Sequence, residues 1–307
     1  MLYVLGSIVG LILILYLLVQ IPWFQTQMAK YAARYLSREL NTEVSIDELE
    51  ILGFKKVGLE GLILYDRRDD TLAFIGSLDV KLSKLKTEGP QLSFRYVDIV
   101  SAGLYLKKYE GDTVSNLHFF LEYLSAGEKD TTGPGFKLSA GEVTATQLSF
   151  RYRDMNAEKK EGIDFKNLDL TGIGFQAADL SIEGDDIRAN MQNLSARDHS
   201  GFHIREFSGD LLVMSDSIDA RDLIIRTNKS DIGMDLAFDF TSFRSFGNFI
   251  DSVRMVAELS DTEVNMSDIG FFAPSLSDMD NGIAVAGKIK GKVSDMKASP
   301  FRFSYGN

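Results

Sequence analysis

The sequence predicts a mainly β protein, with an N-terminal transmembrane helix, a short amphipathic helix and then a long antiparallel β-sheet. Three observations lead to this prediction. Residues 2–21 are almost entirely apolar, residues 25–40 place apolar side chains at helical spacing, and after Asn41 the hydrophobic period changes to two. The expected organisation is a membrane anchor over residues 1–24, an amphipathic helix over residues 25–40 and a β domain over residues 41–307.

The N-terminal segment has the sequence LYVLGSIVGLILILYLLVQI over residues 2–21, and the first charged residue of the chain is Lys30. Twenty helical residues rise about 30 Å, which matches the hydrocarbon core of a bilayer. A cleaved signal peptide is the alternative, but its apolar region is about 7–15 residues long and ends in small residues. Here Trp23 and Phe24 follow, as in an interfacial aromatic belt, so we expect an uncleaved single span.

The orientation of this span depends on two opposing considerations. The nearest basic residues, Lys30, Arg34 and Arg38, lie on its C-terminal side, which by the positive-inside rule would place the body in the cytoplasm. A long domain that follows an N-terminal anchor is, however, translocated largely regardless of its charge. We therefore expect the body to lie outside the cytoplasm.

Residues 25–40 form the predicted amphipathic helix. Its apolar positions are opposite the three basic residues and recur at helical spacing, at Met28, Ala32, Tyr35, Leu36 and Leu40. Two interpretations remain open. The helix packs on the end of the following β domain, which we favour, or it lies on lipid headgroups.

Alternation of apolar and polar residues predicts the strands. It is clearest over residues 78–82, 165–170, 202–205 and 234–240, and it is typical of antiparallel sheets with one apolar face. Turn signals rich in Gly, Asn and Asp recur between the alternating segments, for example at residues 66–70, 183–186 and 280–282. We expect about a dozen to fifteen strands, with helix only near residues 116–124 and 243–249.

One hexapeptide, QLSFRY, occurs twice, at residues 91–96 and 147–152, which supports a repeating β architecture. The pattern does not decide what covers the apolar faces of the strands. Two sheets could pair into a sandwich, one sheet could close into a barrel, or one sheet could curl into a long open groove.

Composition excludes several kinds of chemistry. The chain has no cysteine, so it has no disulfide framework, zinc–thiolate site or cysteine nucleophile. Its net charge of −11 argues against nucleic acid as a partner. The acidic clusters at residues 66–70 and 183–186 lack the ligand order of a calcium loop and are interpreted as solvated hairpin turns. We therefore expect a protein that is not an enzyme, with no catalytic residue, metal or cofactor.

Several segments, in order, resemble the AsmA and TamB group of envelope proteins, specifically the TamB-like proteins of the bacteroidete type. After the apolar span come IPWFQT and the strand-like segments EVSI and VGLEGLILYD, at residues 21–26, 43–46 and 57–66. Further similar segments are GDTVSNL, IRTNKSDI, VNMSDIGFFAP and GKIKG, at residues 111–117, 225–232, 264–274 and 287–291. The resemblance covers nearly the whole chain.

The resemblance implies an AsmA/TamB-like β-groove domain, taco-like in section, that is anchored in the inner membrane with its body in the periplasm. It implies phospholipid transport between the inner and outer membranes, or outer-membrane biogenesis, and it supplies no catalytic residues. The alternative is a structural scaffold of a translocation and assembly module that carries no lipid. Family members are usually longer, so we expect this chain to be an N-terminal part whose missing C-terminal region meets an outer-membrane assembly protein.

Phospholipid acyl chains are the partner that this interpretation predicts for the groove. Alternation then assigns the residues that line it: Leu78, Val80, Leu82, Leu92, Phe94, Leu148, Phe150, Phe165, Leu168, Leu170, Leu236, Phe238 and Phe240. The other interpretation of each is an ordinary β core, and a register error of one residue would reverse the assignment.

Overall fold

The computed structural model describes residues 17, 19–53, 55–83, 91–126 and 137–305. Most of the predicted transmembrane segment lies outside these residues. Within the part of the chain that the structure describes, no helix is both long and apolar enough to span a bilayer. The anchor over residues 1–24 therefore stays a prediction.

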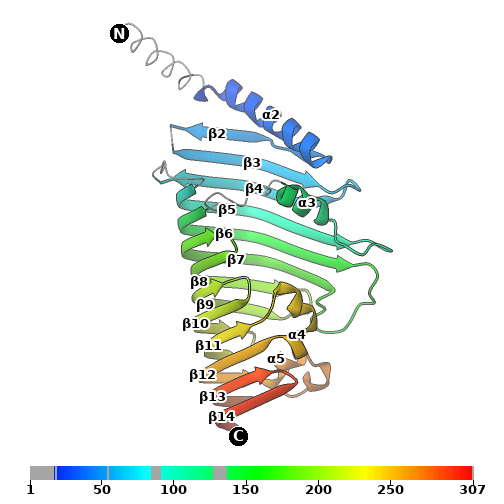
Figure 1. Cartoon of the computed structure of the whole chain (residues 1–307), viewed down its shortest axis with the longest axis vertical. Helices are drawn as coiled ribbons and strands as arrows, with labels where there is room; N and C mark the ends of the chain where they lie inside the picture. The colour runs from blue at the N-terminus through cyan, green and yellow to red at the C-terminus, as the bar shows by residue number, and fades with distance from the viewer. Residues whose placement is uncertain (1–16, 18, 54, 84–90, 127–136, 306–307) are drawn as a thin grey trace.

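The β domain is one large sheet, so the prediction of a mainly β protein is confirmed. Its described strands lie in the order β1-β3-β4-β5-β6-β7-β8-β9-β10-β11-β12-β13-β14, and β2 pairs only with β3. The bounds are β1 (Val44–Ser45), β2 (Glu48–Leu52), β3 (Lys56–Tyr65), β4 (Thr71–Leu82), β5 (Gln91–Lys108), β6 (Lys137–Asp154), β7 (Asn167–Glu183), β8 (Asp186–Asp198), β9 (His203–Val213), β10 (Ser217–Arg226), β11 (Asp231–Asp239), β12 (Arg254–Asn265), β13 (Gly282–Lys292) and β14 (Asp295–Tyr305). Figure 1 shows these strands stacked in chain order from the N-terminal end to the C-terminal end.

The sheet is mixed and not wholly antiparallel, which corrects the prediction. β5 and β6 run parallel, with Gln91 opposite Lys137 and Lys108 opposite Asp154. Parallel neighbours need a connection that returns across the strands, and residues 109–136 provide it. This connection contains α3 (His118–Ala126), close to the helix that the sequence predicts at residues 116–124.

The helix α2 (Pro22–Leu40) begins with a proline in its first turn and ends at Asn41, which is left-handed at φ 50°. Its buried residues are Gln25, Ala29, Ala33 and Leu40. The predicted amphipathic helix is therefore present, but its apolar face is rotated from the predicted one. Tyr35, assigned to the packed face, is 51% exposed on the side of the basic residues.

Four shorter helical segments complete the described fold. The 3-10 helix η1 (Phe243–Asn248) and α4 (Phe249–Ser252) match the helix predicted at residues 243–249. The segments α5 (Met266–Gly270) and η2 (Pro274–Leu276) were not predicted. Each is short and lies in a connection between strands, where hydrophobic periodicity is too brief to register.

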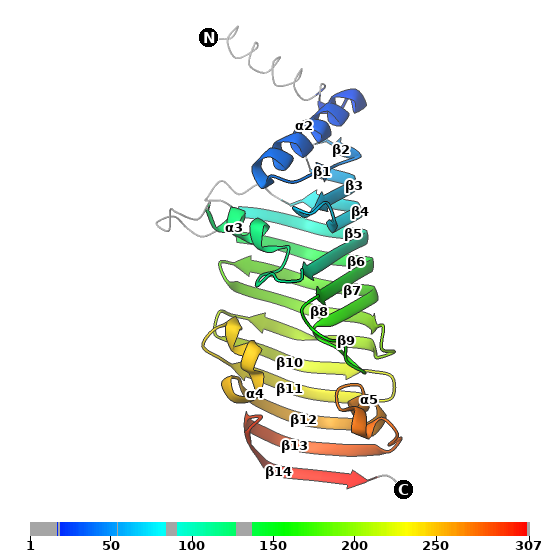
Figure 2. The ribbon, with the colours of Figure 1, turned by 90° about the vertical axis from the view of Figure 1, so that its right-hand side faces the viewer.

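The strands bend along a line that crosses the N-terminal half of the sheet. Gly61 in β3, Ser101 in β5, Gln147 in β6 and Gly172 in β7 all have positive φ, between 56° and 64°. The ladder is interrupted beside each of them, as between Val100 and Gly103 of β5. Such bulges bend and twist a strand locally, and Figures 1 and 2 show the resulting curved sheet.

Few side chains of the described chain are fully buried. The buried hydrophobic residues include eight alanines, whereas leucine is represented only by Leu40, Leu72 and Leu223. One cluster joins α2, α3 and the first strands around Leu72, and another lies around Val143 in the middle of the sheet. Most large apolar side chains of the strands are therefore only half-buried, because no second sheet covers them among the described residues.

Candidate functional site

One face of the sheet carries continuous rows of apolar side chains. Directly opposed residues of neighbouring strands share a face, so the pairings define each row. The longest row runs from β5 to β14 through Leu92, Leu138, Ile182, Ile187, Val213, Ile218, Phe238, Met255, Gly291 and Met296, and only the glycine in β13 contributes no side chain to it. At about 4.8 Å per strand it is about 43 Å long. We call the side of the sheet that carries it the apolar face.

A second row crosses β3 to β11 on the same face. It contains Leu59, Leu78, Ile99, Ala145, Phe175, Leu194, Phe207, Ile225 and Ile232. A third row, nearer the first, runs from β3 to β8 through Val57, Val80, Val97, Val143, Ala177 and Met191. Every member of these two rows is apolar.

The opposite face is polar at the neighbouring positions. The row next to Val80 and Val143 runs from β4 to β10 through Lys81, Tyr96, Glu142, Ala178, Asn190, Asp210 and Arg221. Asn190 donates a hydrogen bond to Asp210 across the strands at 2.6 Å, as expected of side chains in contact with water. The sheet is therefore amphipathic along its length.

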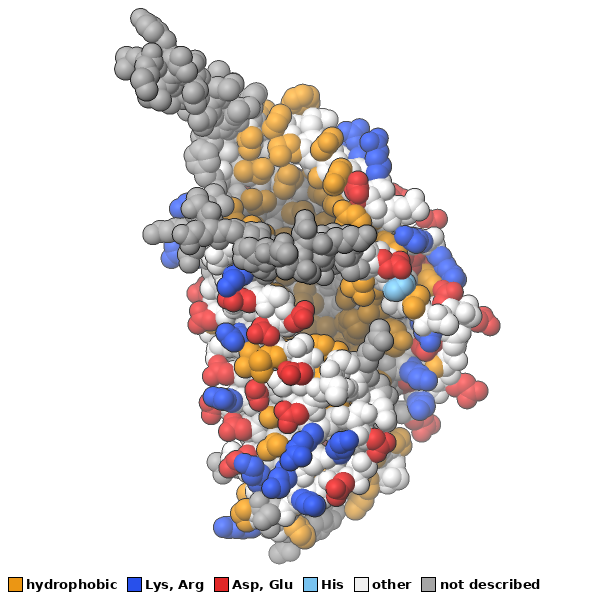
Figure 3. All heavy atoms as spheres, viewed as in Figure 1, with side chains coloured by type: hydrophobic (Ala, Val, Ile, Leu, Met, Phe, Trp, Pro, Cys, Tyr) orange, Lys and Arg blue, Asp and Glu red, His pale blue; other side chains and the backbone are white. Residues whose placement is uncertain are grey.

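The apolar face is hollowed in its N-terminal half. Figure 3 shows hydrophobic side chains lining a depression below α2, whereas charged side chains gather on the surface toward the C-terminal end. On the apolar face of β4, β5 and β6, side chains such as Leu78, Val80, Phe94 and Phe150 remain half-buried. A surface of this kind leaves apolar area in contact with water unless another apolar molecule covers it.

An aromatic segment covers part of the apolar face farther along the sheet. Phe238 of β11 lies against Phe246 and Phe249, with ring centroids 6.1 and 5.7 Å apart. Phe240, one residue past β11, contacts Phe243 and Phe246 at 5.2 and 4.9 Å. The η1–α4 segment thus forms a local lid of phenylalanines over β11.

Phe165 is the predicted lining residue that the structure places elsewhere. It precedes β7 and is 68% exposed, and its ring centroid lies 6.4 Å from that of Phe272, in the segment after α5. Alternation over residues 165–170 suggested a strand, but Asp164 binds the backbone N–H groups of Lys160 and Lys166 and holds this stretch in a turn. The strand begins at Asn167 instead.

The other predicted residues lie on the apolar face. Eleven belong to strands: Leu78, Val80, Leu82, Leu92, Phe94, Leu148, Phe150, Leu168, Leu170, Leu236 and Phe238. Phe240 follows β11 and is buried in the aromatic segment. Their role as lipid contacts stays a prediction. Sequence reasoning missed the rest of the rows, which only the pairing of the strands identifies.

The two copies of QLSFRY occupy different places. Gln91 begins β5, opposite Lys137, whereas Gln147 lies within β6 at the bend. The register between β5 and β6 is 46 residues, and the repeat spacing is 56, so the copies are displaced by ten residues. They therefore do not mark equivalent structural repeats, although both place their phenylalanine on the apolar face.

Along one long margin of the sheet, buried aspartates at the strand ends accept hydrogen bonds from the turns that connect the strands. Asp66 is 1% exposed, and its Oδ1 accepts hydrogen bonds from the backbone N–H groups of Arg68 and Asp70, at 2.8 and 3.0 Å. Its Oδ2 accepts from Tyr109 Oη and Asn116 Nδ2, at 2.7 and 2.8 Å. The turn at residues 66–70 is confirmed, but its first aspartate is buried and not solvated.

These hydrogen bonds shift the pKa values of the side chains along this margin. Burial opposes the charged form of Asp66, but the bonds from Tyr109, Asn116 and the two backbone groups outweigh it and lower the pKa of Asp66. The same balance lowers the pKa values of Asp164 and Asp198, each of which caps a turn. Conversely, burial and the two carboxylates raise the pKa of the Tyr109 hydroxyl.

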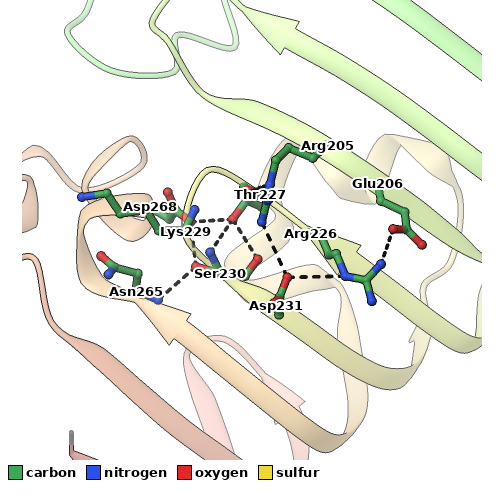
Figure 4. Close-up of polar contacts among 9 residues, drawn as sticks. All are labelled: Arg205, Glu206, Arg226, Thr227, Lys229, Ser230, Asp231, Asn265 and Asp268. Carbon is green, nitrogen blue, oxygen red and sulfur yellow. Dashed lines mark hydrogen bonds and ion pairs between the residues drawn. The ribbon is translucent and has the colours of Figure 1, made fainter.

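The same margin near β10 and β11 holds a polar cluster around Asp268 (Figure 4). Asp268 Oδ2 accepts from the hydroxyls of Thr227 and Ser230 and from the backbone N–H of Lys229. Nearby, Arg226 pairs with Glu206 and Asp231. The carboxylate ties α5 to the turn between β10 and β11, which is a structural role.

Among the described residues, no group of three or more histidine or acidic side chains is arranged to hold a metal ion. The largest continuous chemical feature is instead the apolar face. Comparison with protein-family models, with curated proteins and with solved structures gives no match to this chain.

Proposed function

We propose that this chain is an inner-membrane-anchored periplasmic protein whose apolar face forms a groove that shields phospholipid acyl chains. In this role it contributes to phospholipid transport between the inner and outer membranes or to outer-membrane biogenesis. The observation that carries the proposal is the set of rows without a polar member on a single sheet, the longest about 43 Å. The proposal assigns no catalytic step and no cofactor.

The energetics support a lipid as the occupant of the groove. Each CH₂ group moved from water into an apolar environment gains about 0.8 kcal/mol. The hydrocarbon of one bilayer leaflet is about 15 Å thick, half of a bilayer core, so a 43 Å row exceeds one extended acyl chain. Half-buried Leu, Val and Phe side chains along that row offer contact without a specific pocket. A lipid could therefore move along the part of the face that the η1–α4 segment leaves uncovered without meeting a large desolvation barrier.

Site-specific photo-crosslinking tests the proposal in the full chain. We would replace Phe94 or Phe150, on the apolar face, with p-benzoylphenylalanine and identify covalent adducts by mass spectrometry after illumination of cells. Matched controls are Tyr96 and Tyr105, aromatic residues of β5 on the opposite face, which pair with Lys81 and contact Arg151 respectively. We expect phospholipid adducts at the two phenylalanine positions and only background at the two tyrosines. Equal labelling of both faces, or no lipid at any position, would refute lipid shielding.

A charged substitution tests whether the face acts as a continuous path. In a chain with the photoreactive residue at Phe207 of β9, on the second apolar row, Phe150→Glu should lower the phospholipid adduct at least several-fold, because a carboxylate on the apolar face is costly to bury. Tyr105→Glu is the matched control on the polar face. Circular dichroism identifies any variant that unfolds. An adduct at Phe207 that does not change with Phe150→Glu would refute a continuous path along the face.

The alternative function is a scaffold for outer-membrane protein assembly that carries no lipid. One observation favours it: β14 pairs only with β13 among the described strands, so its other edge can accept a strand from another protein. Phe303 in β14 is 71% exposed. A photoreactive residue at Phe303 should then give a protein adduct while Phe94 and Phe150 give no lipid. Lipid adducts at these two positions would favour the groove.

A further inference from the structure

The helix α2 lies across the N-terminal end of the sheet, and two sets of contacts fix its rotation about its own axis (Figure 2). Gln25 Nε2 donates a hydrogen bond to the carbonyl of Ile51 in β2 at 2.9 Å. Three turns later, Ser37 Oγ accepts from the N–H of Val44 at 3.0 Å. Ala29 and Ala33 are buried between these points. One side of the helix is therefore committed to the sheet.

The opposite side carries aromatic and basic residues, and none of the described strands packs against it. Trp23, Tyr31 and Tyr35 are 69%, 67% and 51% exposed. The exposed basic residues Lys30, Arg34 and Arg38 follow the same side at intervals of four. We call these six residues the α2 stripe, and it extends about 22 Å from Trp23 to Arg38.

The charge of the stripe differs from that of the rest of the chain. Its three cations have no ion pair with any carboxylate of the described residues, and the helix contains only one acidic residue, Glu39. The chain as a whole has a net charge of −11. An acidic body is repelled by an anionic surface, so a local cationic patch determines which part of the molecule can approach one.

The residue types indicate the kind of surface. Tyrosine and tryptophan are amphipathic and favour the headgroup region of a bilayer, and lysine and arginine extend their charges to lipid phosphates. The stripe also continues directly from the apolar segment at residues 2–21, which ends one residue before α2 begins. We propose that the α2 stripe docks on the surface of an anionic phospholipid bilayer.

Docking would orient the whole sheet. Because α2 crosses the N-terminal end, a bilayer against its stripe would meet that end of the sheet and leave the strands stacked away from the membrane (Figures 1 and 2). The N-terminal hollow of the apolar face then lies next to the lipid headgroups. This inference rests on the membrane anchor of the proposed function, but it does not depend on lipid carriage.

The experiment uses the full chain in nanodiscs of phosphatidylcholine, with or without phosphatidylglycerol. The chain has no cysteine, so Glu39→Cys carries a single fluorophore at the end of α2 far from the apolar segment. Lipids with spin-labelled headgroups quench the fluorophore when α2 lies on the bilayer. In nanodiscs of phosphatidylcholine alone, where little docking is expected, the fluorescence of Trp23, the only tryptophan, reports whether the N-terminal segment is inserted.

We expect strong quenching at residue 39 in nanodiscs with phosphatidylglycerol and little in phosphatidylcholine alone. Each basic residue near an anionic leaflet contributes about 1 kcal/mol, which is about fivefold. Lys30→Gln/Arg34→Gln/Arg38→Gln should therefore lower the docking equilibrium on the order of 100-fold. The charge-conserving variant Lys30→Arg/Arg34→Lys/Arg38→Lys should dock normally.

Three lysines of β13 provide a matched control, because Lys288, Lys290 and Lys292 are exposed at the far end of the sheet. Their replacement with glutamine removes the same charge and should leave quenching at residue 39 unchanged. Equal quenching with and without phosphatidylglycerol would overturn the proposal, even if the triple α2 variant unfolds. So would unchanged quenching in a folded triple α2 variant. A water-exposed Trp23 in phosphatidylcholine nanodiscs with the unsubstituted chain would instead refute the anchor.

Discussion

Replacement of Asp66 tests whether a buried carboxylate holds the margin of the sheet together. Four donors converge on it within 3.0 Å: two backbone N–H groups, Tyr109 Oη and Asn116 Nδ2. Asp66→Ala removes every acceptor. Tyr109 can still donate to Asp70 Oδ2, 2.7 Å away, which leaves three donors without their main partner. At about 1–1.5 kcal/mol each, the variant should lose about 4 kcal/mol of the free energy of unfolding.

Asp66→Asn keeps one acceptor oxygen of the carboxylate and replaces the other with an amide, so it tests the second oxygen alone. Its side-chain carbonyl can still accept from Arg68 and Asp70, and its new amide can donate to the Tyr109 hydroxyl. The amide of Asn116 then faces another donor, and it cannot flip because its Oδ1 already accepts from the N–H of Lys107 at 2.8 Å. One unsatisfied buried donor costs about 1–3 kcal/mol, so we expect a loss of about 2 kcal/mol.

Urea denaturation of the full chain, monitored by circular dichroism, measures both changes. Asp69→Asn is the matched control, because Asp69 lies in the same turn, is exposed, and has a φ of 62° that asparagine adopts readily. Its unfolding free energy should change by less than about 0.5 kcal/mol. The reasoning is refuted if Asp66→Asn is as stable as the control, or if Asp66→Ala is no worse than Asp66→Asn.

Three further predictions concern acid stability, the bend and the core. The pKa values of Asp66, Asp164 and Asp198 lie below the ordinary 3.8 in the folded chain, so they stabilise the fold above that pH. The melting temperature should therefore fall as the pH drops from about 5 to 3; a rise would contradict the assignment. Gly61→Ala should cost more than Gly172→Ala, although both have positive φ, because only the Cβ at Gly61 would overlap Asp47, at 2.0 Å. We expect about 2 and 1 kcal/mol in urea denaturation, and equal losses would exclude the overlap. Leu72→Ala should cost about 3 kcal/mol because the side chain is fully buried, and a loss below 1 kcal/mol would show that α3 does not pack on it.

Local sequence was a good guide wherever strand positions alternate without interruption. Residues 78–82 and 234–239 lie in β4 and β11 with the predicted faces. The prediction that Phe165 lies in a strand is wrong, because the turn held by Asp164 shows the same short alternation as the start of a strand. The prediction that Tyr35 lies on the packed face of α2 is wrong, because a helix of mixed composition has no unique apolar side. The polar residue Gln25 lies on the packed face instead, where it donates a hydrogen bond to β2.

Two larger features could not be predicted because they depend on contacts between distant residues. The parallel pairing of β5 with β6 is not encoded in the alternation of either strand. In the register of this pairing, the two copies of QLSFRY are offset by ten residues. The bend requires left-handed backbone at Ser101 and Gln147, which are not residues that favour it. Each is held there by neighbours on both sides of its strand.

The sequence by itself determined that most of the strands are amphipathic, because the two-residue period makes one side of a strand apolar whatever its neighbours are. Only the tertiary structure decided that these sides join into rows up to about 43 Å long, since a row exists only when strands pair in register. It likewise decided which side of α2 faces outward. Both depend on hydrogen bonds between residues far apart in the chain, which local periodicity does not specify.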